Sequence, residues 1–270
     1  MKTSRRALFL SHGGGPLPLL GDTSHQEMVM GLQAIAKQIR KPSAIIVVSA
    51  HWESKQAAVT AAAKPALLYD YNGFPPAAYQ IEYPCQGHPL LAEAIKNKLN
   101  QAGISCRADS KRGFDHGLFV PLKIMYPQAD IPCVQLSLFS HLDPLLHINL
   151  GRALQQIADP DLLLIGSGFS FHNMRAFFTP ETSATAQANR EFEQWLHDTC
   201  QNPGMTELQR SQALINWQNA SHAEFCHPRA EHLMPLHVCY GFAESACTRA
   251  YSLSILDKRA SMYLWDAASK

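Results

Sequence analysis

Uninterrupted runs of hydrophobic residues along the chain predict buried strands of a parallel sheet. The clearest run is residues 44–48, in which four consecutive β-branched residues are followed by a polar group that contains His51. A strand without polar alternation is typical of a sheet that helices cover on both faces. Further hydrophobic runs predict strands over residues 7–10, 57–63, 104–108, 132–138, 162–165, 250–255 and 261–265.

Hydrophobic residues spaced by three and four predict amphipathic helices between these strands. Ser24 with Glu27 predicts a capping box at the start of a helix that Pro42 ends. Pro228 is suited to the first turn of a later helix that contains Glu231 and His232. The remaining helices are predicted over residues 89–102, 143–157, 188–199 and 208–215.

Length and composition fit one large α/β domain. A chain of 270 residues with 46% hydrophobic residues can bury a large core. We therefore expect a single domain over residues 1–270, with a mostly parallel central sheet flanked by helices and a metal site at the carboxyl ends of strands.

Charge and cysteine content exclude several classes of function. The 23 Lys and Arg residues balance 22 Asp and Glu residues, so no electrostatic footprint for nucleic acid or an anionic membrane is present. No hydrophobic stretch is long enough to span a bilayer, and we expect a cytoplasmic protein. The seven cysteines contain no Cys-x-x-Cys pair, which argues against a disulfide framework or a zinc ribbon. The oligomeric state is open, a homo-oligomer included.

Residues 65–87 form a long segment that is rich in Tyr, Pro and Gly and has no regular period. Segments of this length in compact domains are often lids over a site. A packed surface Ω-loop fits the composition equally well. The sequence leaves both interpretations open.

Three histidines follow, or lie close to, the ends of predicted strands: His12, His51 and His172. Each alone is explained as well by a histidine that bonds a neighbouring carbonyl. Parallel strands, however, present their carboxyl ends on one side of a sheet, so the three imidazoles can converge. Neutral imidazoles that converge form a site for Zn²⁺ or Fe²⁺.

A fourth ligand is expected from the predicted helix after His227. His227 and His232 would lie about 140° apart around a regular helix, so one metal ion cannot bind both. Adjacent helical positions diverge by about 100°, so only one of Glu231 and His232 is expected to be a ligand. His227 is then interpreted as a helix cap. The chain contains no His-Glu-x-x-His zinc-protease motif and no glycine-rich phosphate loop.

Six short motifs follow one another along the chain. They are Ser11-His12-Gly13, Val48-Ser49-Ala50-His51-Trp52, Gly73-Phe74-Pro75, Gly113-Phe114-Asp115-His116-Gly117, His172-Asn173 and Glu231-His232-Leu233-x-Pro235-Leu236. Taken together and in this order, they resemble the class III extradiol ring-cleaving dioxygenases, and most closely their DOPA 4,5-dioxygenase extradiol branch. The resemblance runs from about residue 8 to residue 236.

The resemblance implies residue roles and a reaction. His12, His51 and His232 are implied as metal ligands, although the third ligand in the wider class is a carboxylate. His172 is implied as the catalytic acid/base or as a further ligand, and His116 as a catalytic residue that contacts substrate or bound oxygen. Non-haem Fe(II) is the implied cofactor, with Zn(II) as the alternative because three histidines also suit zinc. The implied reactants are a catechol and O₂, and the product is a muconic semialdehyde.

Two other functions fit the same residues. One is a zinc-bound hydrolase or other metal enzyme on the same site. The other is a non-catalytic binding protein of the Memo type. The presence of His12, His51, His172 and His232 together favours an enzyme over the binding protein, because a binding module need not retain all four.

Overall fold

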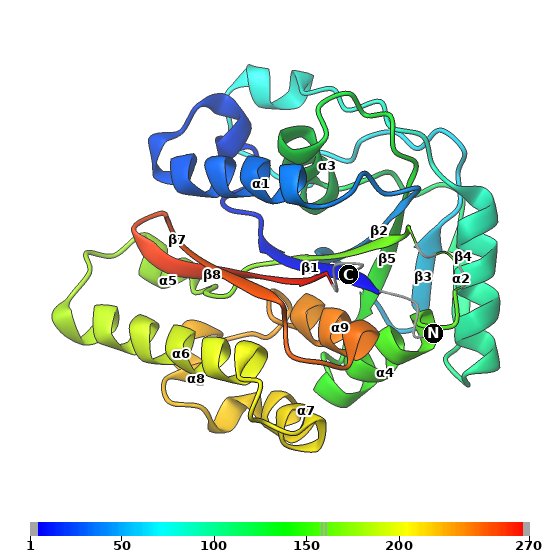
Figure 1. Ribbon diagram of the computed structural model, residues 1–270. Helices are drawn as coiled ribbons and strands as arrows, with labels where there is room; N and C mark the ends of the chain where they lie inside the picture. Colours follow the sequence, from blue (N-terminus) through cyan, green and yellow to red (C-terminus); the bar gives the residue numbers. More distant parts are fainter. Residues whose placement is uncertain (1–4, 158, 160, 267–270) are drawn as a thin grey trace.

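Eight strands form one mixed sheet in this computed structural model, which describes residues 5–157, 159 and 161–266 (Figure 1). The strand order is β4-β3-β5-β2-β6-β1-β8-β7. The four central strands pair in parallel, β3 also pairs in parallel with β4, and the other pairings are antiparallel. The strands are β1 (Arg6–Ser11), β2 (Ile45–Ser54), β3 (Ala57–Thr60), β4 (Cys106–Asp109), β5 (Cys133–Phe139), β6 (Leu163–Gly168), β7 (Arg249–Ile255) and β8 (Lys258–Asp266).

Helices cover both faces of this sheet. Helices α1 and α3 lie on one face, and α4, α6 and α9 lie on the other (Figure 1). The α-helices are α1 (Gln26–Gln38), α2 (Pro89–Gln101), α3 (His116–Met125), α4 (Pro144–Leu154), α5 (Met174–Phe177), α6 (Ser183–Gln201), α7 (Glu207–Ile215), α8 (Ala223–Cys226) and α9 (Met234–Ala243). Short 3-10 helices are η1 (Leu17–Leu20), η2 (Thr23–His25), η3 (Pro76–Gln80) and η4 (Trp217–Asn219). The predicted fold, a single α/β domain with a mostly parallel sheet, is confirmed; that it extends over all of residues 1–270 stays a prediction.

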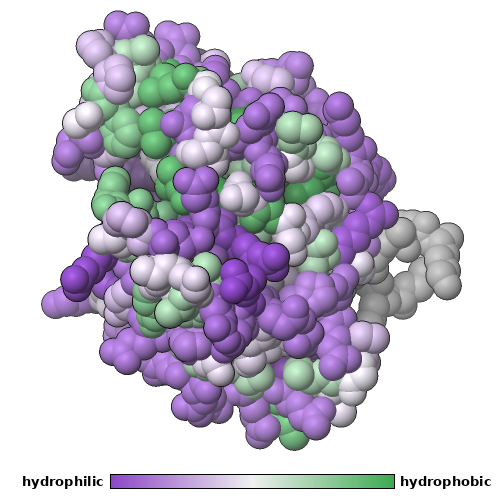
Figure 2. All heavy atoms as spheres, turned by 90° about the vertical axis from the view of Figure 1, so that its left-hand side faces the viewer, coloured by the Kyte–Doolittle hydropathy of each residue, from purple (hydrophilic) through white to green (hydrophobic). Residues whose placement is uncertain are grey.

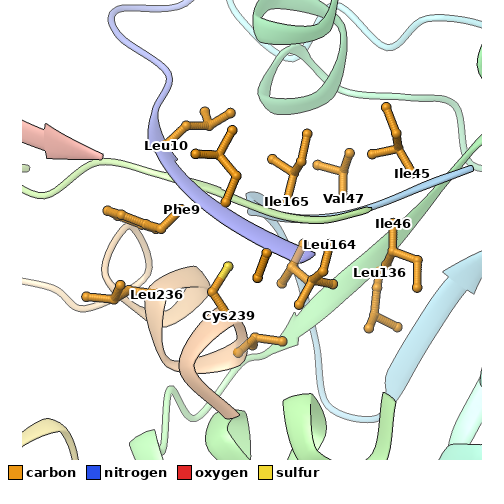
Figure 3. Packing of buried hydrophobic residues seen from close by; sticks show 14 of the residues in the cluster. Phe9, Leu10, Ile45, Ile46, Val47, Leu136, Leu164, Ile165, Leu236 and Cys239 are labelled. Carbon is orange, nitrogen blue, oxygen red and sulfur yellow. The ribbon is translucent and has the colours of Figure 1, made fainter. Parts of the chain in front are cut away.

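The hydrophobic run at residues 45–48 is buried on both faces, as its lack of alternation predicts. Ile45, Ile46, Val47 and Val48 all have 0% of their surface exposed. Figure 3 shows Ile45 and Val47 pointing toward the α3 side and Ile46 toward the α9 side of the sheet. Burial of each such side chain contributes about 1.5–3 kcal/mol, so this strand is a rigid base for the residues at its carboxyl end.

Several strand boundaries differ from the prediction. Strand β2 continues through His51 to Ser54, with its register to β5 shifted between Val48 and Glu53. Such irregularities bend a strand and redirect its side chains, and this one includes His51. Strand β3 ends at Thr60 rather than at residue 63, and β4 begins two residues later than expected, at Cys106.

The predicted capping box of Ser24 and Glu27 is wrong. The side chain of Asp22 accepts a hydrogen bond from the Ser24 backbone N–H and caps the 3-10 helix η2 that precedes α1. Glu27 instead accepts a bond from the backbone N–H of Ser254. Asp22 is itself a strong N-cap residue, so it starts the helical turn two residues earlier than Ser24 would.

The predicted helix from Pro228 is also wrong. Residues 227–233 are turns and bends between α8 and α9, and Pro235 occupies the first turn of α9. The carbonyl oxygen of His232 accepts a bond from the Phe169 backbone N–H at 3.0 Å. A Cβ atom at Gly168 would lie only 2.1 Å from that oxygen. The conformation of residues 227–233 is therefore set by their contact with the end of β6. The local sequence of these residues does not predict this contact.

The surface seen in Figure 2 is mainly hydrophilic, with hydrophobic residues gathered in its upper part. Within the described residues, every helix is too short or too polar to cross a bilayer.

We predict that Gly168→Ala disturbs both the fold and the position of His232. The added methyl group has to displace the backbone of residue 232, at an expected cost of about 1–3 kcal/mol in the free energy of unfolding. Gly31→Ala is the matched control, because nothing lies within 4 Å of a Cβ there and alanine favours α1. Urea unfolding and zinc titration measure the two effects. Equal stability and zinc affinity in both variants would contradict this prediction.

We predict that His147 makes the protein less stable in acid. Its ring is buried, with Nε2 accepting from the Phe139 N–H and Nδ1 donating to the Asp143 carbonyl. Burial lowers the pKa of His147 to about 4. The unfolded chain takes up this proton near pH 6.5, so stability is full above that pH and is lost as pH falls toward 4.

His147→Gln should therefore reduce the pH dependence of the unfolding free energy by about one proton, or about 1.4 kcal/mol per pH unit. Urea unfolding at several pH values between 6.5 and 4 measures the slope. The exposed His141→Gln is the control and should keep the wild-type slope. Identical slopes in the two variants would show that His147 titrates normally.

Candidate metal centre

The carboxyl ends of β1 and β2 bring His12 and His51 together. His12 follows directly after β1, and His51 lies in the irregular part of β2. Their Nε2 atoms are 3.0 Å apart. Strand β6 separates the two strands in the sheet, so the histidines approach each other across its end.

Ser167 determines which nitrogen of His12 is free. Its hydroxyl donates to the Gly117 carbonyl at 2.5 Å, so the same oxygen is available to accept from His12 Nδ1 at 3.0 Å. Nδ1 of His12 therefore carries the proton, and Nε2 keeps a lone pair. Metal-binding histidines usually donate the N–H of their second ring nitrogen to such an acceptor.

Glu231 holds His232 in the same way. Nδ1 of His232 donates to Glu231 Oε1 at 2.9 Å, which leaves Nε2 with the lone pair. The centroid of the His232 ring lies 5.2 Å from that of His12 and 5.1 Å from that of His51. His232 is thus equally close to both strand-end histidines.

His172 lies against His232 rather than directly against His12 and His51. The two rings are stacked, with centroids 3.4 Å apart and an interplanar angle of 16°. Nδ1 of His172 is 3.3 Å from the same Glu231 oxygen that His232 contacts. The expectation that only one of Glu231 and His232 is a ligand rested on a helix that does not form, and it stays a prediction. Both residues lie in one group with His172.

His116 is the first residue of α3. Its ring centroid lies 3.9 Å from that of His51 and 5.6 Å from that of His12. Asp70 accepts from its Nδ1 at 2.8 Å. His116 is therefore a member of the same cluster, next to His12 and His51.

Two groups have the spacing of metal ligands among the described residues. Within each group, the candidate ligand atoms lie no more than 4.8 Å apart. The groups are His12, His51 and His116, and His172, Glu231 and His232. All five histidines predicted for the site come together, but the choice of His12, His51 and His232 as the ligands stays a prediction.

Burial keeps the imidazoles of His12, His51 and His232 uncharged. Burial and the neighbouring imidazoles lower the pKa values of His12 and His51 well below the ordinary value. Burial and His172 lower the pKa of His232 to about 3, although Glu231 opposes this. Burial raises the pKa of Glu231, but hydrogen bonds from His172 and His232 outweigh that effect and hold the pKa well below its usual range. The site therefore combines neutral imidazoles with an ionised carboxylate.

Two arginines connect the site to its surroundings. Arg229 donates to both oxygens of Glu53 at 2.6 Å and forms an ion pair with Glu231 at 3.1 Å. Arg112 lies over the Trp52 ring, donates to the His51 carbonyl and pairs with the buried Asp115. These contacts attach β2 to the start of α3 and to the turn before α9.

Several residues that contact the histidine cluster were not predicted from the sequence. Ser167, Asp70 and Arg229 each hold a histidine or its carboxylate partner, yet none belongs to a metal-binding motif. Asp70 is an isolated acidic residue within the long aromatic segment, and no local pattern identifies it. His227, expected as a cap of the later helix, instead lies at the C-terminal end of α8, with Nε2 bonded to the Ser170 carbonyl.

The donor set fits Fe(II) or Zn(II). Both ions accept imidazole nitrogens, and several neutral imidazoles with free Nε2 atoms provide them. Such histidines are typically held by hydrogen bonds from Nδ1, as observed for His12, His232 and His116. These contacts leave Nε2 as the free nitrogen of each ring.

Comparison with known proteins identifies relatives over nearly the whole chain. The family model described as the catalytic LigB subunit of aromatic ring-opening dioxygenase matches residues 6–260. Dioxygenase tasH of Hapsidospora irregularis is 37% identical over 96% of this chain and 84% of its own length. The 4,5-DOPA dioxygenase extradiol of Beta vulgaris is 38% identical over 88% of this chain and 87% of its own length.

A solved structure is similar to nearly the whole chain. The crystal structure of an uncharacterized protein from Escherichia coli K12 superimposes with a TM-score of 0.76 and 28% identity, covering 96% of this chain and 99% of that one. The family suggested by the sequence motifs is confirmed. The chain belongs to the class III extradiol family of aromatic ring-opening dioxygenases, whose catalytic subunits are of the LigB type.

Proposed function

We propose that the protein inserts both atoms of O₂ into a DOPA-like or protocatechuate-like catechol and cleaves the ring next to the hydroxyls, giving a muconic semialdehyde. Its cofactor would be non-haem Fe(II), held by His12, His51 and His232. The observation that carries the proposal is the cluster of neutral imidazoles at the strand ends. Relatives named 4,5-DOPA dioxygenase extradiol support a catechol of this class.

The ion, when bound, would supply coordination positions for the catechol oxygens and O₂ and a path for electrons between them. The chain's own residues orient the reactants around those positions. His12 and His232 offer only lone pairs there, because their Nδ1 protons are engaged by Ser167 and Glu231. Holding two reactants in contact replaces an unfavourable bimolecular encounter.

His172 is the proposed acid/base residue. Its Nδ1 lies beside Glu231, so Nε2 is the nitrogen that takes a catechol hydroxyl proton and later returns it to the cleaved product. Glu231 orients the imidazole and stabilises its protonated form, as the aspartate does in a Ser-His-Asp triad. Arg229 in turn holds Glu231.

His116 is proposed to contact the substrate or bound oxygen. Its ring lies closest to that of His51, whereas the ring of His172 stacks on that of His232. With Asp70 accepting from Nδ1, its free nitrogen is Nε2.

The imidazole-rich donor set also supports a second candidate, a zinc-bound hydrolase on the same site. Three histidines are a common zinc ligand set, and a bound water could take the remaining position. The identity of the metal that supports activity separates the two candidates.

We predict that apo-protein reconstituted anaerobically with Fe(II) consumes oxygen with DOPA or protocatechuate, whereas zinc-loaded protein does not. An oxygen electrode measures uptake, and visible absorbance detects the yellow semialdehyde product. No uptake across a panel of catechols would reject the dioxygenase, and ester hydrolysis by the zinc form would favour the second candidate.

We predict that His172→Ala retains iron but loses turnover. Removing an acid/base group typically lowers kcat by about 10²–10⁴-fold. Metal analysis and kcat are measured together, with the exposed His141→Ala as the control that should match the wild type. Loss of iron from His172→Ala would instead identify His172 as a ligand.

A further inference from the structure

Asp70 makes two contacts beyond its bond to the His116 ring. It lies in the irregular segment 61–75 that precedes η3, between two tyrosines. Its Oδ1 accepts from the His116 backbone N–H at 3.1 Å and from His116 Nδ1 at 2.8 Å. Its Oδ2 is 3.9 Å from Nδ1 of His51. One carboxylate therefore faces two imidazoles that arise from different elements, β2 and α3.

We propose that Asp70 is a positioning residue that acts through His116. This proposal rests on the proposed function: Asp70 holds the His116 ring so that Nε2 is free to contact the catechol. It also attaches the Tyr- and Pro-rich segment 65–87 to the histidine cluster.

The bonds to His116 restrict both the ring and its protonation. A carboxylate accepts only, so the bonded Nδ1 carries a proton, and the neutral ring is held in the tautomer whose Nε2 is the acceptor. The second bond, to the backbone N–H, fixes Asp70 relative to the first turn of α3. A histidine held at both its backbone and its ring has little freedom to rotate away from the site.

The charge of Asp70 also indicates a role at the centre. Its side chain is only 17% exposed, and its carboxylate faces the imidazoles of His51 and His116. A largely buried carboxylate is costly unless it is paired with positive charge or well hydrogen-bonded. Glu231, its counterpart across the cluster, has Arg229 as a cationic partner. Asp70 therefore directs its charge toward the imidazoles and any cation they hold.

The residues beside Asp70 form an aromatic wall, which we define as Tyr69, Tyr71, Phe74, Tyr79 and Phe119. The Tyr71 ring contacts the edge of the His116 ring, with centroids 5.6 Å apart, and also contacts Phe74 and Tyr79. The hydroxyls of Tyr69 and Tyr71 donate to the Ile81 and Ala78 carbonyls. The hydroxyls are thus engaged in holding the segment, and Asp70 is the residue that bonds it to His116.

The test compares Asp70→Ala with Glu82→Ala, a matched removal of an exposed carboxylate from the same region of the chain. Two properties are measured: binding of 4-nitrocatechol to the zinc-loaded protein, followed by its visible absorbance, and kcat/KM of the Fe(II) enzyme with a catechol. Asp70→Ala is expected to weaken nitrocatechol binding and lower kcat/KM by about 10–100-fold. Metal content and the behaviour of Glu82→Ala should match the wild type.

A double-mutant cycle with His116→Ala tests whether Asp70 acts through His116. In the His116→Ala background, Asp70→Ala should change either property by less than about 2-fold. The same loss in both backgrounds, a loss of metal, or wild-type behaviour of Asp70→Ala would each overturn the proposal. If Asp70→Ala does not fold, the cycle is repeated with Asp70→Asn, which has the same shape. The loss of nitrocatechol affinity and kcat/KM should then be smaller, and it should again be absent in the His116→Ala background.

The design separates this proposal from the proposed function. A wild-type protein that consumes no oxygen with any catechol rejects the dioxygenase. The nitrocatechol titration needs no turnover, so it still tests Asp70. An unchanged affinity in Asp70→Ala would then reject the positioning role independently.

Discussion

The candidate centre depends on keeping closely spaced imidazoles uncharged. The Nε2 atoms of His12 and His51 are 3.0 Å apart. Two positive charges at that distance would repel by roughly 5 kcal/mol at an effective dielectric constant near 20. Burial makes the neutral forms favourable, and Ser167 and Glu231 select the tautomers of His12 and His232 that leave Nε2 free. Closely spaced neutral imidazoles whose Nε2 atoms carry lone pairs form a site that attracts a cation.

The strand order makes this spacing available. Strand β6 lies between β1 and β2, so the ends of all three meet although they are far apart in the sequence. Ser167 and Gly168 occupy the end of β6, where one bonds His12 and the other allows the backbone of His232 to approach. On this base of buried strands, the histidines that follow β1, lie in β2, begin α3 and precede α5 and α9 can then face one another. A site of this kind is rigid because its supports belong to the hydrophobic core.

Sequence patterns predicted the parts that local chemistry determines. The β-branched run at residues 45–48 identified the central strand, and the histidines at strand ends identified the cluster. The turn at residues 227–233 was predicted as a helix because Pro228 suits a first turn, but contact with β6 overrides that preference. Asp70 and Ser167 are single residues whose roles depend on histidines distant in the sequence, so no local pattern could identify them. The ligand set itself rests on family resemblance, since His116 and His232 are both close to the strand-end pair.

The central claim is that His12, His51 and His232 bind one catalytic ion while His172 remains free to move a proton. Anomalous X-ray diffraction at the iron edge, from anaerobic crystals of Fe(II)-loaded protein with a catechol, tests it most directly. The account predicts one anomalous peak bonded by Nε2 of these three histidines, with His172 beside the catechol and not bonded to iron. A peak held by His172 and Glu231, or by His116 in place of His232, would contradict it.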